Sequence, residues 1–72
     1  MSKKGKLLAK VRQRIRNVSL EEFETLIDMY GHIELGGKHP KAIIGKNTMP
    51  YKRENPVKSC YVTEVIDIID SL

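Results

Sequence analysis

The stretch VSLEEFETLIDMYG, residues 18–31, carries the clearest structural signal in this chain of 72 residues. Ser19 and Glu22 match the S-x-x-E capping box, in which each side chain accepts a hydrogen bond from the other residue's backbone amide. Apolar residues then recur with the spacing of one helix face, at Phe23, Leu26, Ile27 and Tyr30. Gly31 is expected to end the helix in the left-handed conformation. The stretch therefore predicts a helix from about Leu20 to Tyr30.

After this helix the apolar period changes from about four residues to two. Ile33 and Leu35 alternate with polar neighbours, which is typical of a strand, and Gly36-Gly37 then predicts a tight turn. A second strand is expected at residues 41–44. Gly45-Lys46 is expected to form a two-residue hairpin turn with glycine first.

A third strand is expected at residues 47–52, with Met49 and Tyr51 on one face. Pro50 lacks a backbone N–H, so it indicates an edge strand or a strand end. The three predicted strands form a small antiparallel sheet.

The segments at the two ends of the chain also have helical patterns. Residues 6–17 combine a narrow apolar stripe with many basic residues, and they are expected to form a basic helical or turn-rich arm. Residues 1–5 are expected to be disordered. Residues 59–72 are expected to be helical, with Cys60 as a small core residue. The buried stripe of this last helix is Val62, Val65, Ile66 and Ile69.

These elements predict a single α+β domain over residues 1–72, in the order helix, helix, three strands, helix. The helices must cover one face of the sheet for a core to close. A lone cysteine indicates a reducing compartment, and neither a membrane-length apolar run nor a secretory signal is present, so the expected location is the cytoplasm.

The chain has 13 basic and 9 acidic residues, a net charge of +4, which favours an anionic partner. The basic residues cluster in two segments, residues 3–16 and 38–58. In the first of these, Lys10 and Arg14 belong to a stripe that is as consistent with a solvated face as with phosphate binding.

His39 is the strongest candidate for chemistry, because imidazole exchanges protons near neutral pH. It follows Gly36 and Gly37, which are expected to let a substrate backbone approach closely. The setting fits RNA cleavage in which a 2′-hydroxyl attacks the adjacent phosphate, with His39 as proton acceptor or donor. Four basic residues are expected to stabilise the charge on the phosphate: Lys38, Lys41, Lys52 and Arg53.

The same residues also have non-catalytic interpretations. A single histidine after a glycine turn is also consistent with a solvated surface residue, and His32, next to the helix end, is expected to be structural. Two histidines and one cysteine at these separations match no zinc-binding spacing, and the glycines form no nucleotide-binding fingerprint. The sequence therefore predicts neither a metal nor a cofactor.

Several segments resemble the longer members of the HicA toxin family. They are RIRNVSLEEF at 14–23, Tyr30-Gly31, GGKH at 36–39, MPYKRENPVK at 49–58 and Tyr61-Val62. The resemblance implies a fold like the double-stranded-RNA-binding domain and an mRNA interferase activity. It also implies inhibition by a HicB-like antitoxin that covers the active face.

In the family the catalytic histidine lies in a Gly-Ser-His turn, which Gly37-Lys38-His39 matches at glycine and histidine. Lys38 replaces the usual serine, Pro40 stands where many members have a second histidine, and the histidine common in the third strand is absent. The expected function is a metal-independent endoribonuclease. The alternative is a non-catalytic domain on the same scaffold that binds RNA or a protein partner.

Overall fold

The computed structural model describes residues 3–72 and contains three helices and one three-stranded sheet. In chain order the elements are α1 (Lys3–Gln13), α2 (Leu20–Tyr30), β1 (His32–Glu34), β2 (Lys41–Ile44), β3 (Asn47–Pro50) and α3 (Ser59–Asp70). The predicted α+β class and the predicted order of elements are confirmed.

Helix α2 begins and ends where its sequence predicts. The Ser19 hydroxyl accepts a hydrogen bond from the Glu22 amide at 3.1 Å, and the Ser19 amide donates to Glu22 Oε1 at 3.3 Å. This capping box satisfies backbone donors that the first turn leaves free. Phe23, Leu26 and Ile27 are fully buried, so the predicted apolar face is the face in the core.

Gly31 ends α2, but not in the predicted left-handed conformation. Its φ of −168° is extended, and any residue adopts such a value. The need for glycine comes instead from crowding, because a Cβ at this position would lie 1.9 Å from the carbonyl oxygen of Ile43. The chain passes from α2 into β1 directly against the backbone of β2, and only a residue without a side chain fits there.

The sheet is antiparallel throughout, in the order β1-β2-β3. Its register aligns Ile33, Ala42 and Met49 across the three strands on one face, and Ala42 and Met49 are buried there. Gly45 has a φ of +62°, whereas no residue other than glycine has a positive φ in residues 3–72. Glycine at the first turn position with positive φ is the type II′ pattern, and the predicted two-residue turn with glycine first is confirmed. Pro50 is the last residue of β3, an edge strand, which is also confirmed.

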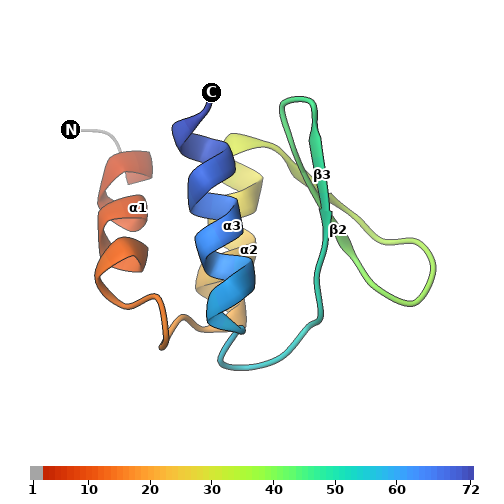
Figure 1. Ribbon diagram of the computed structural model, residues 1–72, viewed down its shortest axis with the longest axis horizontal. Coiled ribbons are helices and arrows are strands. Elements are labelled where there is room, and N and C mark those ends of the chain that lie inside the picture. The colour runs from red at the N-terminus through yellow and green to blue at the C-terminus, as the bar shows by residue number, and fades with distance from the viewer. Residues whose placement is uncertain (1–2) are drawn as a thin grey trace.

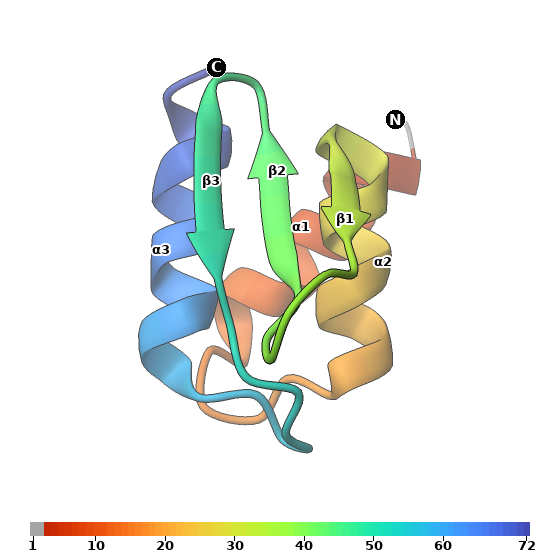
Figure 2. The same cartoon turned by 90° about the vertical axis from the view of Figure 1, so that its right-hand side faces the viewer.

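The helices all lie on one side of the sheet (Figure 1). Viewed onto the sheet, α3 lies behind β3 and α2 behind β1 (Figure 2). Helix α1 packs against α2 and α3, away from the sheet. The core contains residues from all three helices, from β2 and β3, and from the linking segments, including Val11, Val18, Phe23, Ile44, Val57 and Val65. Within residues 3–72 there is no helix with the length and apolar character needed to cross a bilayer.

The structure also differs from the predictions at Leu35, at Cys60 and at the start of the chain. Leu35 lies beyond β1 and is 75% exposed, because the chain leaves the sheet after Glu34. Cys60 is exposed rather than buried: it lies two residues before Val62, about 200° away around the helix, so it faces away from the buried stripe. Residues 3–5 were expected to be disordered but form the start of α1, while residues 1 and 2 lie outside the described residues.

Candidate active site

His39 lies in the loop of residues 35–40 that joins β1 to β2, and it is exposed. Gly37 in this loop has a φ of +78°, a conformation that favours glycine. A Cβ built at Gly36 or Gly37 would meet no atom within 4 Å, so the loop is open on that side. The predicted glycine turn before His39 is therefore present and leaves space for a ligand.

The end of the loop is tied to the segment that follows β3. Pro40 is buried, and its carbonyl accepts a hydrogen bond from the Tyr51 amide at 3.1 Å. This bond extends the pairing of β2 and β3 by one step beyond the Lys41–Pro50 pair. Because His39 precedes Pro40 and Lys52 follows Tyr51, the bond brings the imidazole and the ammonium group to the same end of the sheet.

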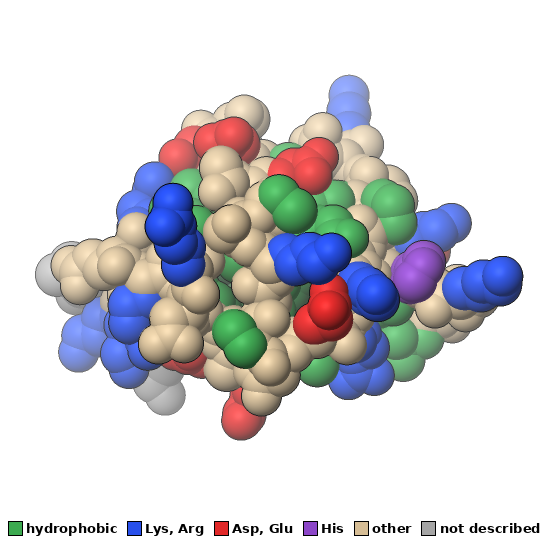
Figure 3. Space-filling view, turned by 60° about the horizontal axis from the view of Figure 1, so that its bottom comes forward, with side chains coloured by type: hydrophobic (Ala, Val, Ile, Leu, Met, Phe, Trp, Pro, Cys, Tyr) green, Lys and Arg blue, Asp and Glu red, His purple; other side chains and the backbone are tan. Residues whose placement is uncertain are grey.

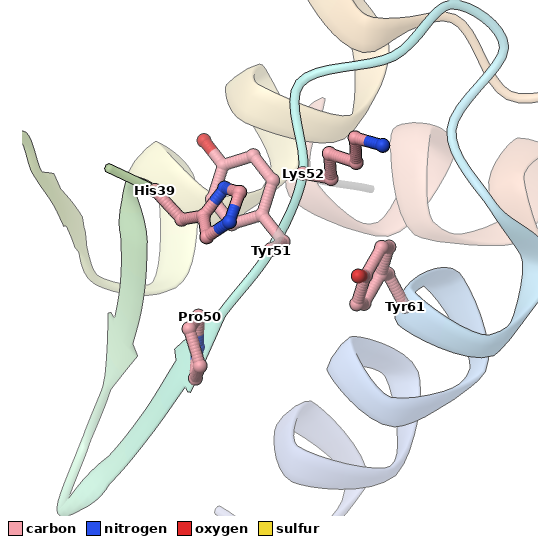
Figure 4. A pocket seen from close by; sticks show the side chains of 5 residues that line it. All are labelled: His39, Pro50, Tyr51, Lys52 and Tyr61. Atoms are coloured by element: carbon pink, nitrogen blue, oxygen red, sulfur yellow. The ribbon is translucent and has the colours of Figure 1, made fainter.

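His39 and Lys52 line one open cavity of about 200 Å³, together with Pro50, Tyr51 and Tyr61 (Figure 4). The lining residues come from three places in the chain: the loop before β2, the end of β3, and the first turn of α3. In the view of Figure 4, His39 and Tyr61 lie on either side of the 50–52 segment. The structure thus places the predicted catalytic residue and one of the four predicted cations around one hollow, with the Lys52 side chain on the same side of the 50–52 segment as Tyr61.

Tyr51 fixes this cavity to the core. Its side chain is buried and packs edge to face against Phe23, with ring centroids 5.0 Å apart. Its hydroxyl donates a hydrogen bond to Glu24 Oε2 at 2.6 Å. Burial raises the pKa of Tyr51, and the Glu24 carboxylate raises it further. The hydroxyl therefore stays protonated and bound to Glu24, which makes Tyr51 a positioning residue rather than a proton donor.

Arg53 is held away from His39 by the same carboxylate. Its Nε lies 3.2 Å from Glu24 Oε2, and its Nη2 donates to Glu24 Oε1 at 3.2 Å. Arg53 lines a different cavity of about 240 Å³, with Glu24, Asp28, Ile33 and Leu35. Its charge is partly neutralised by Glu24, so it is a poorer phosphate contact than its sequence position indicates.

The remaining two cations of the predicted site, Lys38 and Lys41, do not line the cavity of His39. Lys41, exposed on β2, lines a third cavity of about 310 Å³ with Glu34, Leu35 and Gly36. Lys38 is exposed in the loop itself, directly before His39. The loop of residues 35–40 is therefore surrounded by three separate hollows, and it is Lys52 that shares the one lined by His39.

Lys10 and Arg14 are far from His39. Lys10 is exposed on α1, and Arg14 follows the end of that helix, whereas the loop of His39 lies at the opposite end of the molecule (Figure 1). Figure 3 shows Lys and Arg side chains gathered at both ends, with a histidine among those at the sheet end. Two of the arginines near α1 are paired with acids, Arg12 with Asp70 and Arg14 with Glu22. The structure does not bring the two predicted basic regions together.

The Arg14 ion pair joins the cap of α2 and leads to a prediction about stability. Arg14 Nη2 donates to Glu22 Oε2 at 2.5 Å. Burial raises the pKa of the Glu22 carboxyl, but hydrogen bonds from the Ser19 amide and from Arg14 outweigh it, so the net pKa lies below its ordinary value. A lowered pKa means that the stabilisation is complete above the ordinary value of about 4.3 and is lost as the pH falls through the folded-state pKa.

Glu22→Gln keeps an oxygen that accepts from Ser19 but removes the charge. The substitution is expected to lower the free energy of unfolding by about 0.5–1 kcal/mol at neutral pH, and the difference from wild type is expected to vanish in strongly acidic solution. The free energy of unfolding of both proteins is measured by urea titration, with circular dichroism as the signal, at neutral pH and in strongly acidic solution. Glu21→Gln, at an exposed acid in the same first turn, controls for the helix dipole alone. A Glu22 effect that is the same at both pH values would contradict the assigned role.

His32, the second histidine, lies apart from the cavity of His39. His32 is exposed on β1, with Nε2 3.9 Å from Glu34 Oε1, and it does not line the cavity of His39. Within the described residues, no group of three or more His, Cys, Asp or Glu side chains is placed to hold a metal ion.

Three lining residues of the cavity are absent from the set that the sequence predicts: Pro50, Tyr51 and Tyr61. Tyr61 carried a usable signal: it is an aromatic residue near the start of the last helix, outside the Val62, Val65, Ile66 and Ile69 stripe. Pro50 carried none beyond its strand position. The candidate site is thus defined by its geometry, as an exposed imidazole, an ammonium group and an aromatic ring around one hollow. Comparisons of the chain with family models, with curated proteins and with solved structures gave no match.

Proposed function

We propose that this protein is a toxin-type endoribonuclease that cleaves mRNA in the cytoplasm without a metal, with His39 as the residue that moves the proton. One observation carries the proposal: the His39 imidazole is exposed and lines an open cavity together with Lys52. A group that exchanges protons near neutral pH, sharing one hollow with a positive charge, meets the two needs of phosphodiester cleavage.

The proposed reaction uses the RNA's own nucleophile. The 2′-oxygen forms a bond to the adjacent phosphorus while the bond from phosphorus to the 5′-oxygen of the next nucleotide breaks. The 2′-hydroxyl proton is released and the leaving 5′-oxygen gains one, so the products are a 2′,3′-cyclic phosphate and a 5′-hydroxyl. His39 carries one of these two proton transfers, and water in the open cavity carries the other. Lys52 lowers the energy of the transition state by opposing the negative charge that develops on the phosphate oxygens.

Two further features support this proposal. The order α2-β1-β2-β3-α3, with both helices on one face of an antiparallel sheet, is the order of the double-stranded-RNA-binding domain. The sequence segments that resemble the HicA family include the loop that carries His39. A HicB-like antitoxin is the proposed protein partner, and Leu35, exposed in this loop, offers it an apolar contact beside the site.

A non-catalytic domain that binds RNA is the second candidate. Glu24 binds both the Tyr51 hydroxyl and Arg53, so neither of these groups is free to assist His39. The residues that line the cavity then offer one imidazole, His39, and one ammonium group, Lys52. This small set of groups is the observation that favours the second candidate. Such a site suits binding as well as catalysis, and this candidate predicts salt-sensitive RNA binding without cleavage.

The test is incubation of the purified protein with single-stranded RNA in the presence of EDTA, followed by analysis of the fragment ends. Fragments with 2′,3′-cyclic phosphate and 5′-hydroxyl ends are expected. RNA that stays intact under conditions in which the protein binds it would reject the nuclease and favour the second candidate. Fragments with 5′-phosphate ends would reject the proposed attack by the 2′-hydroxyl.

A further inference from the structure

We infer that the cavity of His39 takes an unpaired nucleotide whose base stacks on Tyr61, so that the site acts on single-stranded RNA and not on a duplex. The inference rests on the proposed function for the identity of the ligand as RNA. It concerns a residue outside the set that the sequence predicts, and it assigns the kind of RNA that the site accepts.

Tyr61 has the position and the support to stack on a flat ligand. It lies in the first turn of α3 and is half-buried, in contact with the hydrophobic core, and it also lines the cavity. Packing against the core fixes the ring, so little side-chain entropy is lost when a base stacks on it. Figure 4 shows the ring projecting from α3 towards the 50–52 segment, on the opposite side of that segment from His39. A nucleotide in the cavity therefore has an aromatic group at one end and the imidazole at the other.

The size of the cavity favours one base over a helix. At about 200 Å³ it is smaller than the roughly 300–1,000 Å³ of pockets for drug-sized ligands, so it suits a single ring system. The bases of a duplex are stacked on one another and leave no face for a side chain. Proteins that recognise unpaired RNA use aromatic side chains as stacking platforms, whereas duplex RNA is contacted along its shallow minor groove.

The charges around the cavity agree with this arrangement. His39 and Lys52 both line the hollow, on opposite sides of the 50–52 segment, so a nucleotide with its base on Tyr61 has its phosphate between the ammonium group and the imidazole. An unpaired nucleotide also gives the chemistry a benefit, because the 2′-oxygen must lie in line with the bond that breaks. A strand held in the A-form helix does not present this geometry.

The experiment measures binding to RNA that cannot be cleaved. A short 2′-O-methyl oligonucleotide is titrated as a single strand and, in parallel, as a duplex of the same sequence. The proteins are wild type, Tyr61→Leu, which keeps apolar packing but removes the ring, and Tyr61→Phe, which keeps the ring. Tyr61→Leu is expected to bind the single strand about ten-fold more weakly than wild type, since stacking on one aromatic ring contributes roughly that factor or more. Tyr61→Phe is expected to bind like wild type, and duplex binding is expected to be the same for all three.

Thermal unfolding of each variant separates a binding defect from a folding defect. A folded Tyr61→Leu protein that binds the single strand like wild type would overturn the inference, as would an equal loss of affinity for the duplex. If Tyr61→Leu fails to fold, a second experiment uses Tyr61→Phe and a series of oligonucleotides, each lacking the base at one position. Loss of one base is expected to weaken binding at the position that stacks on the ring. If binding is the same for every oligonucleotide in the series, the inference is overturned. Ring-dependent binding without any cleavage of ordinary RNA would reject the nuclease and leave this inference standing.

Discussion

Replacing His39 by alanine is expected to lower the rate of RNA cleavage by roughly 10²- to 10⁴-fold, which is the usual contribution of one positioned acid or base. The loss follows from the proposed reaction, in which the imidazole carries one proton transfer. Among the described residues that line the cavity, there is no second imidazole to replace it. Lys52 remains in the variant, so the rate is expected to stay above that of RNA without protein. The measurement is the initial rate of cleavage of a labelled single-stranded RNA.

His32→Ala is the matched control for this prediction. His32 is also exposed, and it lies on β1 beside Glu34, outside the cavity of His39. Its removal is expected to leave the cleavage rate within about a factor of two, because a surface substitution away from the site changes stability by no more than about 0.5 kcal/mol. Equal rates for wild type and His39→Ala would reject His39 as the residue that moves the proton. Equal losses in both histidine variants would point to an effect on folding.

Expression in a bacterial host gives the same comparison a second readout. Wild type is expected to arrest growth, and His39→Ala is expected to be tolerated at the same level of protein. His32→Ala is expected to arrest growth like wild type.

The elements of this fold are visible in the sequence because each has its own local signal. The Ser19 and Glu22 capping box and the spacing of Phe23, Leu26 and Ile27 define α2 without reference to any other segment. Gly45 at the start of a two-residue turn fixes the register of β2 and β3. Turn residues, capping residues and the spacing of apolar residues act over a few positions, so they can be recognised in the sequence before any tertiary contact is known.

The composition of the site is less visible, since it depends on contacts between distant segments. The bond between the Tyr51 amide and the Pro40 carbonyl brings Lys52 to the same end of the sheet as His39, and the pairing of Arg53 with Glu24 keeps Arg53 out of the hollow that these two line. Neighbouring positions in the sequence, Lys52 and Arg53, thus have different surroundings. Charge clustering in the chain predicted both as phosphate contacts, because it carries no information on which cation meets an acid from α2.

Substitution of Gly31 is expected to have the largest effect on stability. The sequence correctly predicts a glycine-dependent end of α2, but for a reason that the structure replaces: φ is extended, and the constraint is the Ile43 carbonyl 1.9 Å from where a Cβ would stand. Gly31→Ala is therefore expected to lower the free energy of unfolding by about 3 kcal/mol or more, at the upper end of the cost of overpacking, since backbone atoms of β2 must move. In a domain of this size such a loss is a large share of the total stability.

Asparagine at the same position separates the two explanations. Asparagine tolerates the left-handed conformation better than most residues, so a left-handed end of α2 would make Gly31→Asn much milder than Gly31→Ala. Crowding against β2 instead makes both substitutions severe, because both add a Cβ. Gly36→Ala is the control. The φ of Gly36 is not positive, and a Cβ there would meet no atom within 4 Å, so the change in the free energy of unfolding is expected to stay within about 1 kcal/mol. Alanine reduces the conformational freedom of the unfolded chain, so a change of this size would be stabilising. Urea unfolding of the three variants measures these differences, and a mild Gly31→Asn beside a severe Gly31→Ala would show that backbone conformation, not the approach of β2, requires the glycine.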